Sequence, residues 1–208
     1  MQEYLSAFVT LFVTIDPPGL APLFLALTSG MVREERRQIG MRASVIAFGI
    51  LVLFALAGTA ILGLFGITIH AFRTAGGLLL FYIAFEMIFE KRQERHERSA
   101  ERAVTIDEMR NLSVFPLAIP LIAGPGAISA TILLGGTFAE PLRRGALIGI
   151  IAVNIALVYA VFLVAERIDR VLGATGRIVL TRLLGIILAA LAVQFVADGM
   201  LSLARAAR

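Results

Sequence analysis

Long apolar stretches, separated by shorter polar or charged connections, run the length of this chain. The stretches cover residues 4–28, 43–65, 70–89, 112–136, 145–165 and 183–204. About 20 apolar residues suffice to cross a bilayer as an α-helix. The pattern therefore predicts an all-α membrane protein with six transmembrane helices in a single domain, residues 1–208, with no room for a separate soluble domain.

The first stretch is interrupted at its centre by Asp16-Pro17-Pro18-Gly19. The prolines lack a backbone N–H, so the carbonyls of Val13 and Thr14 lose their helical donors. In hydrocarbon such groups cost several kcal/mol unless protein or a water-filled cavity satisfies them. The interruption therefore predicts a broken helix with a binding site near the membrane midplane.

A second interruption, Gly124-Pro125-Gly126, lies in the fourth stretch, and Pro125-Gly126 follows Pro18-Gly19 by 107 residues. Arg73 with Gly76 and Arg182 with Gly185 repeat in the same way, 109 residues apart. The charged segment 90–110 reads as a cytoplasmic connector between halves 1–89 and 111–208. Each half has an odd number of predicted spans, so the halves must have opposite orientations. This is the inverted-repeat plan of many secondary transporters.

Asp16 allows two interpretations. Asp followed by Pro is a favourable helix start, in which the carboxylate would cap the second half-helix by accepting from the N–H of Gly19. An ionisable group at mid-membrane also usually faces a cavity or a partner. The two roles are compatible.

The two breaks would bring half-helix N-termini and free carbonyls to one place, which suits a small zwitterion. The carboxylate would bind the N-termini at Gly19 and Gly126, and the ammonium would bind carbonyls or Asp16. Ser129, Asn154 and Gln194 are also small or polar residues within the predicted spans. Each either makes contacts between helices or forms part of the same site. The candidate binding residues are Thr14, Asp16, Pro17, Pro18, Gly19, Gly124, Pro125, Gly126, Ser129, Asn154 and Gln194.

The third and sixth stretches carry charges at both ends. If these helices pack together, Arg73 could pair with Asp198 and Glu86 with Arg182, as gates or structural clamps. The alternative is that these side chains extend to the lipid headgroups.

Charge placement predicts topology. Of the 19 basic residues, 14 lie in 29–42, 90–111 and 166–182, which the positive-inside rule assigns to the cytoplasm, with both termini outside. The net charge of +4 thus reflects topology, and nucleic-acid binding is not expected. There is no cysteine, no metal-ligand spacing and no enzyme signature, so neither a cofactor nor a catalytic residue is predicted. The first residues also lack the positive region of a cleaved signal peptide.

Segments 14–19, 72–77, 116–120, 123–126 and 181–185 together closely resemble the MarC family, also described as a six-helix neutral amino acid transporter family. The resemblance implies a multi-pass protein of the bacterial or archaeal inner membrane, distantly akin to the lysine-exporter superfamily. It also implies that some members are proton-coupled carriers of small neutral amino acids.

The leading hypothesis is a secondary transporter of small neutral amino acids such as glycine, alanine and serine, coupled to H⁺ or Na⁺ and working by alternating access. The alternatives are a channel, a non-transporting membrane interaction protein, or an exporter of another small solute. The expected surroundings are the lipid bilayer and a small zwitterionic solute, and a homo-oligomer is possible.

Overall fold

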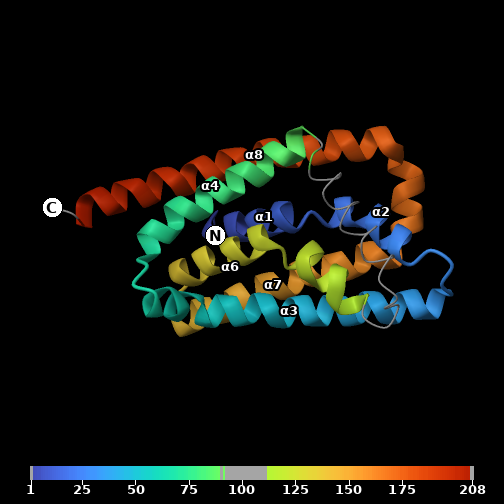
Figure 1. Ribbon diagram of the computed structural model, residues 1–208, viewed down its shortest axis with the longest axis horizontal. Helices are drawn as coiled ribbons and strands as arrows, with labels where there is room; N and C mark the ends of the chain where they lie inside the picture. Colours follow the sequence, from blue (N-terminus) through green and yellow to red (C-terminus); the bar gives the residue numbers. More distant parts are fainter. Residues whose placement is uncertain (1, 90, 92–111, 207–208) are drawn as a thin grey trace.

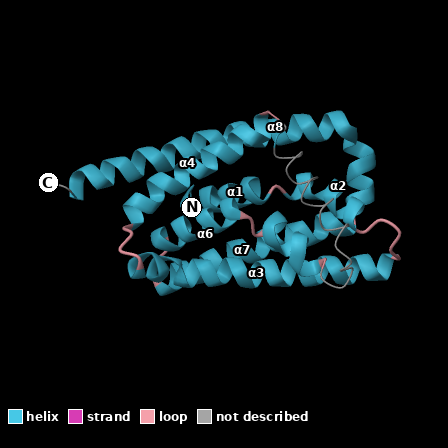
Figure 2. Ribbon diagram, in the orientation of Figure 1, coloured by secondary structure: helices cyan, strands magenta, loops and turns pink. Residues whose placement is uncertain are grey.

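The computed structural model describes residues 2–89, 91 and 112–206, and this part of the chain is helical, with turns and no strand (Figure 2). Apart from residue 91, the predicted connector 90–110 lies outside the described residues. The elements are α1 (Gln2–Ile15), α2 (Pro17–Leu27), α3 (Arg33–Leu64), α4 (Ile69–Ile88), η1 (Ser113–Ile122), α6 (Pro125–Thr137), α7 (Pro141–Leu163) and α8 (Ala165–Ala206).

The short helices lie inside the molecule and the long ones outside it. In Figure 1, α4 and α8 run along one side, α3 and α7 along the other, and α1, α2 and α6 lie between them. In the most apolar part of Gln2–Leu27, 61% of the residues are buried, against 17% in Thr175–Ala206. Irregular backbone at membrane depth is tolerated only where protein covers it, which explains why the interrupted segments occupy the interior.

Five of the described segments are long and apolar enough to cross a bilayer, and the bent pair of η1 and α6 would make a sixth. At two of these segments the helix begins before the predicted span does. The second predicted span begins at residue 43, but α3 already begins at Arg33. Hydropathy marks where lipid contact begins, whereas the Arg- and Glu-rich residues before it are good helix formers that extend the same helix into water.

The sixth predicted span also begins earlier than expected. The helical segment of α8 that contains the apolar stretch starts at Thr175 and not at residue 183, and α8 is bent at Gly173, which has a φ of 57°. Such a positive φ favours glycine, so this residue lets the chain turn at the end of the molecule before the long helix begins.

Corresponding helices of the two halves pack against each other in opposite directions. Thr74 on α4 contacts Gly199 on α8, whereas Ala84, further along α4, contacts Gly185, which comes earlier in α8. In the same way, Arg36 near the start of α3 contacts Glu166, just after α7. Both pairs of helices, α4 with α8 and α3 with α7, are therefore antiparallel.

A glycine controls how closely α4 approaches α8. A Cβ at Gly77 would lie 2.9 Å from both the carbonyl oxygen of Ala192 and the backbone N of Val196. These are backbone atoms, so Gly77→Ala can be accommodated only by separating the helices, at a cost of roughly 1–3 kcal/mol. We expect this variant to lower the melting temperature in detergent, followed by far-UV circular dichroism.

Gly49→Ala is the matched control for this prediction. It lies within α3 with nothing within 4 Å of its Cβ position. Removing a helical glycine there should leave stability unchanged or raise it by about 0.5–1 kcal/mol. Equal melting temperatures for the two variants would contradict the close packing of α4 on α8.

Candidate functional site: the meeting point of two helix breaks

The first break is a single residue wide. Asp16 separates α1 from α2, has left-handed backbone angles (φ 58°, ψ 62°) and is only 4% exposed. Its N–H still donates to the carbonyl of Phe12 (2.9 Å), and its carbonyl accepts from Leu20 (3.2 Å). Asp is one of the few residues other than glycine that adopt this conformation readily, because its short side chain can hydrogen-bond locally. The break therefore interrupts the helix while keeping the hydrogen bonds on either side, and Gln2–Leu27 still counts as one candidate span.

The Asp16 side chain caps α2, as the Asp-Pro sequence predicts. Its Oδ1 accepts from the N–H of Gly19 at 3.2 Å, and Pro17 occupies the first turn of the helix. A Cβ at Gly19 would overlap Oδ2 of the same carboxylate. Glycine at position 19 is therefore what allows the buried carboxylate to lie over the start of α2.

The second break separates η1 from α6, and the two helices meet at an angle of 61°. Gly124 precedes α6 in an extended conformation and makes no side-chain cap, and Pro125 occupies the first turn. Among the described residues the N–H groups of Gly126 and Ala127 have no hydrogen-bond acceptor. Two buried donors therefore point out of the N-terminus of α6, where the helix dipole favours negative charge.

These two breaks meet. A Cβ at Gly126 would overlap Cδ1 of Ile83 and lie 3.1 Å from Cγ2 of Thr14. Thr14 belongs to the last turn of α1 and is 3% exposed. The carbonyl end of α1, the start of α2 and the N–H end of α6 are therefore brought together.

Asn154 lies at the same depth as Asp16. The rings of Phe24 and Phe162 stack at 4.2 Å, and α7 runs in the same direction as α1 and α2, because Glu3 pairs with Arg143 at the opposite end. Asp16 and Asn154 each lie about 12 Å, or eight residues, from that stack. Gly40 of α3 contacts the same stack. The two polar residues thus lie at similar depth in the bundle.

Asn154 also has an unused polar atom. Its side chain is fully buried, and Nδ2 donates to the carbonyl of Ile150 at 3.0 Å. Oδ1 has no partner among the described residues, and neither does the buried hydroxyl of Ser44 on α3. Sequence reasoning missed Ser44. It lies about one turn deeper than Gly40, among small residues whose usual role is helix packing, so nothing in the sequence distinguishes it.

Each end of the bundle carries an aromatic pair and an ion pair. At one end Phe24 stacks on Phe162, and Arg36 pairs with Glu166 at 2.6 Å. At the other end Tyr4 packs edge-on against Phe138, with ring centroids 5.5 Å apart, and Arg143 pairs with Glu3. Every one of these contacts joins the first half of the chain to the second. Arg143 follows Arg36 by 107 residues, the same offset that relates the two breaks.

The remaining predicted residues lie on α4, α6 and α8. Ser129 is buried on α6, one turn after Pro125, whereas Gln194 is exposed and donates to Asp198 of its own helix at 2.9 Å. Gln194 was therefore wrongly grouped with the interior, because a helix position does not reveal its face until the packing is known.

The ends of α4 and α8 hold the four charged residues for which ion pairs were predicted. Within the described residues Arg73 donates to Thr137 at 3.4 Å and forms no ion pair with Asp198, which has the nearer partner Gln194 one turn away. At the other end Glu86 is buried and Arg182 is exposed, and their pairing stays a prediction. The described residues contain no group of three His, Cys, Asp or Glu able to hold a metal ion.

Comparison with known proteins identifies the family of the chain. The profile of the MarC family integral membrane proteins matches residues 1–204. The chain belongs to the MarC family. Its relatives include a UPF0056 membrane protein of Archaeoglobus fulgidus, 39% identical over 205 residues (96% of this chain and 93% of the relative). The UPF0056 membrane protein YvbG of Bacillus subtilis is 38% identical over 200 residues (93% and 92%), and YhcE of Escherichia coli is 36% identical over 196 residues (94% and 91%).

These relatives place MarC proteins in both bacteria and archaea. Their names state a membrane location and no substrate. No solved structure matches the chain. The relatives therefore do not identify what this MarC protein binds.

Proposed function

We propose that this protein is a secondary transporter of small neutral amino acids, with its substrate site where the two helix breaks meet. The observation that carries the proposal is the contact of Gly126 with Thr14, which joins a helix N-terminus to a helix C-terminus in the interior. A zwitterionic amino acid has one charge for each of these ends.

The substrate carboxylate would accept from the N–H groups of Gly126 and Ala127. Among the described residues these two N–H groups have no hydrogen-bond acceptor. The ammonium would bind the Asp16 carboxylate and the carbonyls at the end of α1, which Pro17 and Pro18 deprive of helical donors. Asn154 offers a further buried acceptor at the same depth. The buried residues of α6 next to the break are small, among them Gly126, Ala127 and Ser129, which suits glycine, alanine or serine better than an amino acid with a large side chain.

The contacts at the two ends of the bundle are compatible with alternating access. Each end joins the two halves by one aromatic pair and one ion pair, so an end can open by separating side chains without unfolding a helix. The antiparallel packing of corresponding helices supports the inverted repeat, with both termini on the outer side of the inner membrane. Asp16 is the proposed proton-coupling group, and no enzymatic reaction is part of the proposal.

The test is uptake of labelled glycine, alanine and serine into proteoliposomes, with and without an inward proton gradient. We expect saturable uptake that the gradient increases. The chain has no cysteine, so Arg36→Cys/Glu166→Cys and Glu3→Cys/Arg143→Cys can each be linked by a short, reducible bis-methanethiosulfonate reagent. Linking either end should stop uptake, and reductant should restore it. Single-cysteine variants treated in the same way are the controls.

Two results would contradict the proposal. Non-saturable flux that persists with either end linked would indicate a channel. Absence of uptake for all three amino acids, in vesicles where reconstitution is verified, would remove them as substrates.

A further inference from the structure

A cavity of about 830 Å³ lies at the end of the molecule where α3 begins and α7 ends, outside the Phe24–Phe162 stack. None of the residues at the two breaks lines it. One wall is strongly basic, with four arginines against two glutamates. These arginines are Arg33, Arg36, Arg37 and Arg167.

Two of the four arginines are already engaged. Arg36 pairs with Glu166 at 2.6 Å, and its Nε donates to the carbonyl of Thr28 at 3.2 Å. Arg37 donates to the Tyr159 hydroxyl at 3.4 Å.

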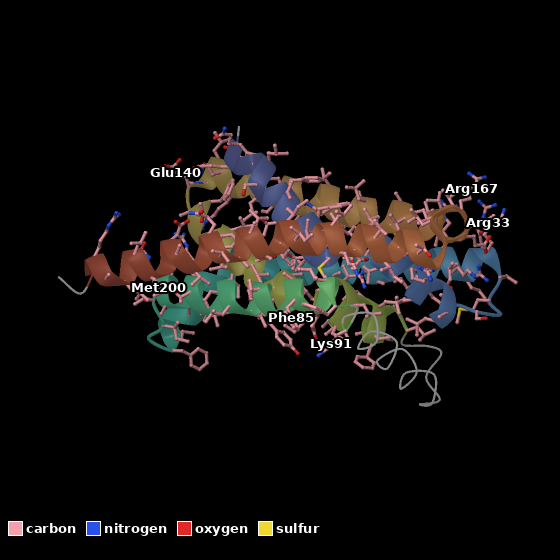
Figure 3. The ribbon with its side chains drawn as sticks, turned by 90° about the horizontal axis from the view of Figure 1, so that it is seen from above. Arg33, Phe85, Lys91, Glu140, Arg167 and Met200 are labelled. Carbon is pink, nitrogen blue, oxygen red and sulfur yellow. The ribbon has the colours of Figure 1, made fainter. Side chains whose placement is uncertain are left out.

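The other two guanidinium groups, of Arg33 and Arg167, are exposed and have no side-chain hydrogen bond or ion pair within the described residues. Figure 3 shows them near each other at one end of the molecule. Guanidinium groups that line one cavity without ionic partners favour an anion there, and phosphate is an anion that matches their donor geometry well.

The cavity also has an apolar lining at the end of α7, where Leu163 and Val164 are 50% and 39% exposed. Val164 lies directly beside Arg167, whose N–H donates to the Val164 carbonyl at 2.9 Å, so this part of the lining offers charge and apolar surface together. A soluble phosphate would gain nothing from this apolar lining, whereas a phospholipid would place its acyl chains along it. The charge distribution of the chain also predicts that this end is cytoplasmic, where basic pockets between transmembrane helices bind anionic headgroups.

We propose that this cavity is a binding site for one anionic phospholipid, with the headgroup phosphate held by Arg33 and Arg167 and the acyl chains along Leu163 and Val164. The lipid binds outside the Phe24–Phe162 stack and does not enter the centre of the bundle. The site is therefore independent of the proposed amino acid site.

The test is lipid binding to the full chain in detergent, counted by native mass spectrometry. The probes are dioleoylphosphatidylglycerol, dioleoylphosphatidylcholine and inorganic phosphate. We expect saturable binding of one phosphatidylglycerol, and weaker binding of phosphatidylcholine. Arg33→Gln/Arg167→Gln should weaken phosphatidylglycerol binding by about fivefold for each arginine, or roughly 25-fold in all.

Arg144→Gln/Arg205→Gln removes the same charge near the opposite end and should change the affinity less than about twofold, since charges beyond a Debye length are screened. Arg33→Lys/Arg167→Lys retains the charge and should bind more tightly than the glutamine variant, which separates lost binding from lost folding. Equal weakening by both glutamine pairs would overturn the proposal. Equal affinity for the two lipids, or displacement of the lipid by millimolar phosphate, would overturn it as well.

Discussion

Asp16→Asn should abolish the stimulation of amino acid uptake by a proton gradient. Asparagine adopts left-handed backbone angles as readily as aspartate and can still accept from the N–H of Gly19. The break and the cap are therefore retained, and only the charge and the titratable proton are lost. If Asp16 carries the proton, the variant should exchange substrate across the vesicle membrane but not accumulate it against a gradient. We expect net accumulation to fall at least tenfold.

Asp16→Ala is the companion variant, because it removes the cap as well as the charge. It should lose about 1 kcal/mol of stability relative to Asp16→Asn. Gradient-driven accumulation by Asp16→Asn equal to that of wild type would exclude the carboxylate from coupling and leave it only the structural role of a helix cap.

Gly126→Ala should weaken substrate binding strongly. The new methyl group would overlap Cδ1 of Ile83 and press on Thr14 at 3.1 Å. Relief of this overlap would displace the start of α6, whose N–H donors we assign to the substrate carboxylate. Loss of one charge-assisted hydrogen bond of this kind is worth about 1.5–3 kcal/mol, so the dissociation constant should rise by more than tenfold.

The control is Gly76→Ala, which also adds a methyl group between buried helices. Its Cβ would lie 3.0 Å from Cδ1 of Leu133, a flexible aliphatic side chain like that of Ile83. Gly76 lies on α4, away from both breaks in sequence. The Gly76→Ala variant should therefore leave the affinity for the substrate unchanged. A loss as large as that of Gly126→Ala would show that any tighter packing in the interior impairs binding.

The sequence predicted the all-α membrane fold, because long apolar stretches depend on local composition alone. A carboxylate followed by two prolines leaves carbonyls without donors wherever the helix lies. Helix ends were less well predicted, since Arg33 and its neighbours continue α3 although they are too polar to lie in lipid. Apolar stretches locate the bilayer and not the limits of a helix.

Contacts between distant segments could not be predicted in this way. Arg36 and Glu166 are 130 residues apart, and Arg143 and Glu3 are 140 apart. Their pairing depends on how the helices are arranged around the breaks. The sequence offered Arg73 with Asp198 as one of two interpretations, but a nearer hydrogen-bond partner, Gln194, engages that carboxylate. Local composition predicts which groups need a partner, and packing decides which partner each one has.

The proposed site, where the two breaks meet, binds both charges of a small amino acid. Equilibrium binding of labelled alanine to the purified protein tests it most directly, with unlabelled alaninamide and propionate as competitors that each lack one charge. We expect saturable binding that Gly126→Ala weakens more than tenfold and that Gly76→Ala leaves unchanged. Neither competitor should displace alanine at concentrations where unlabelled alanine does. Equal binding by the two glycine variants, or full displacement by propionate alone, would contradict it.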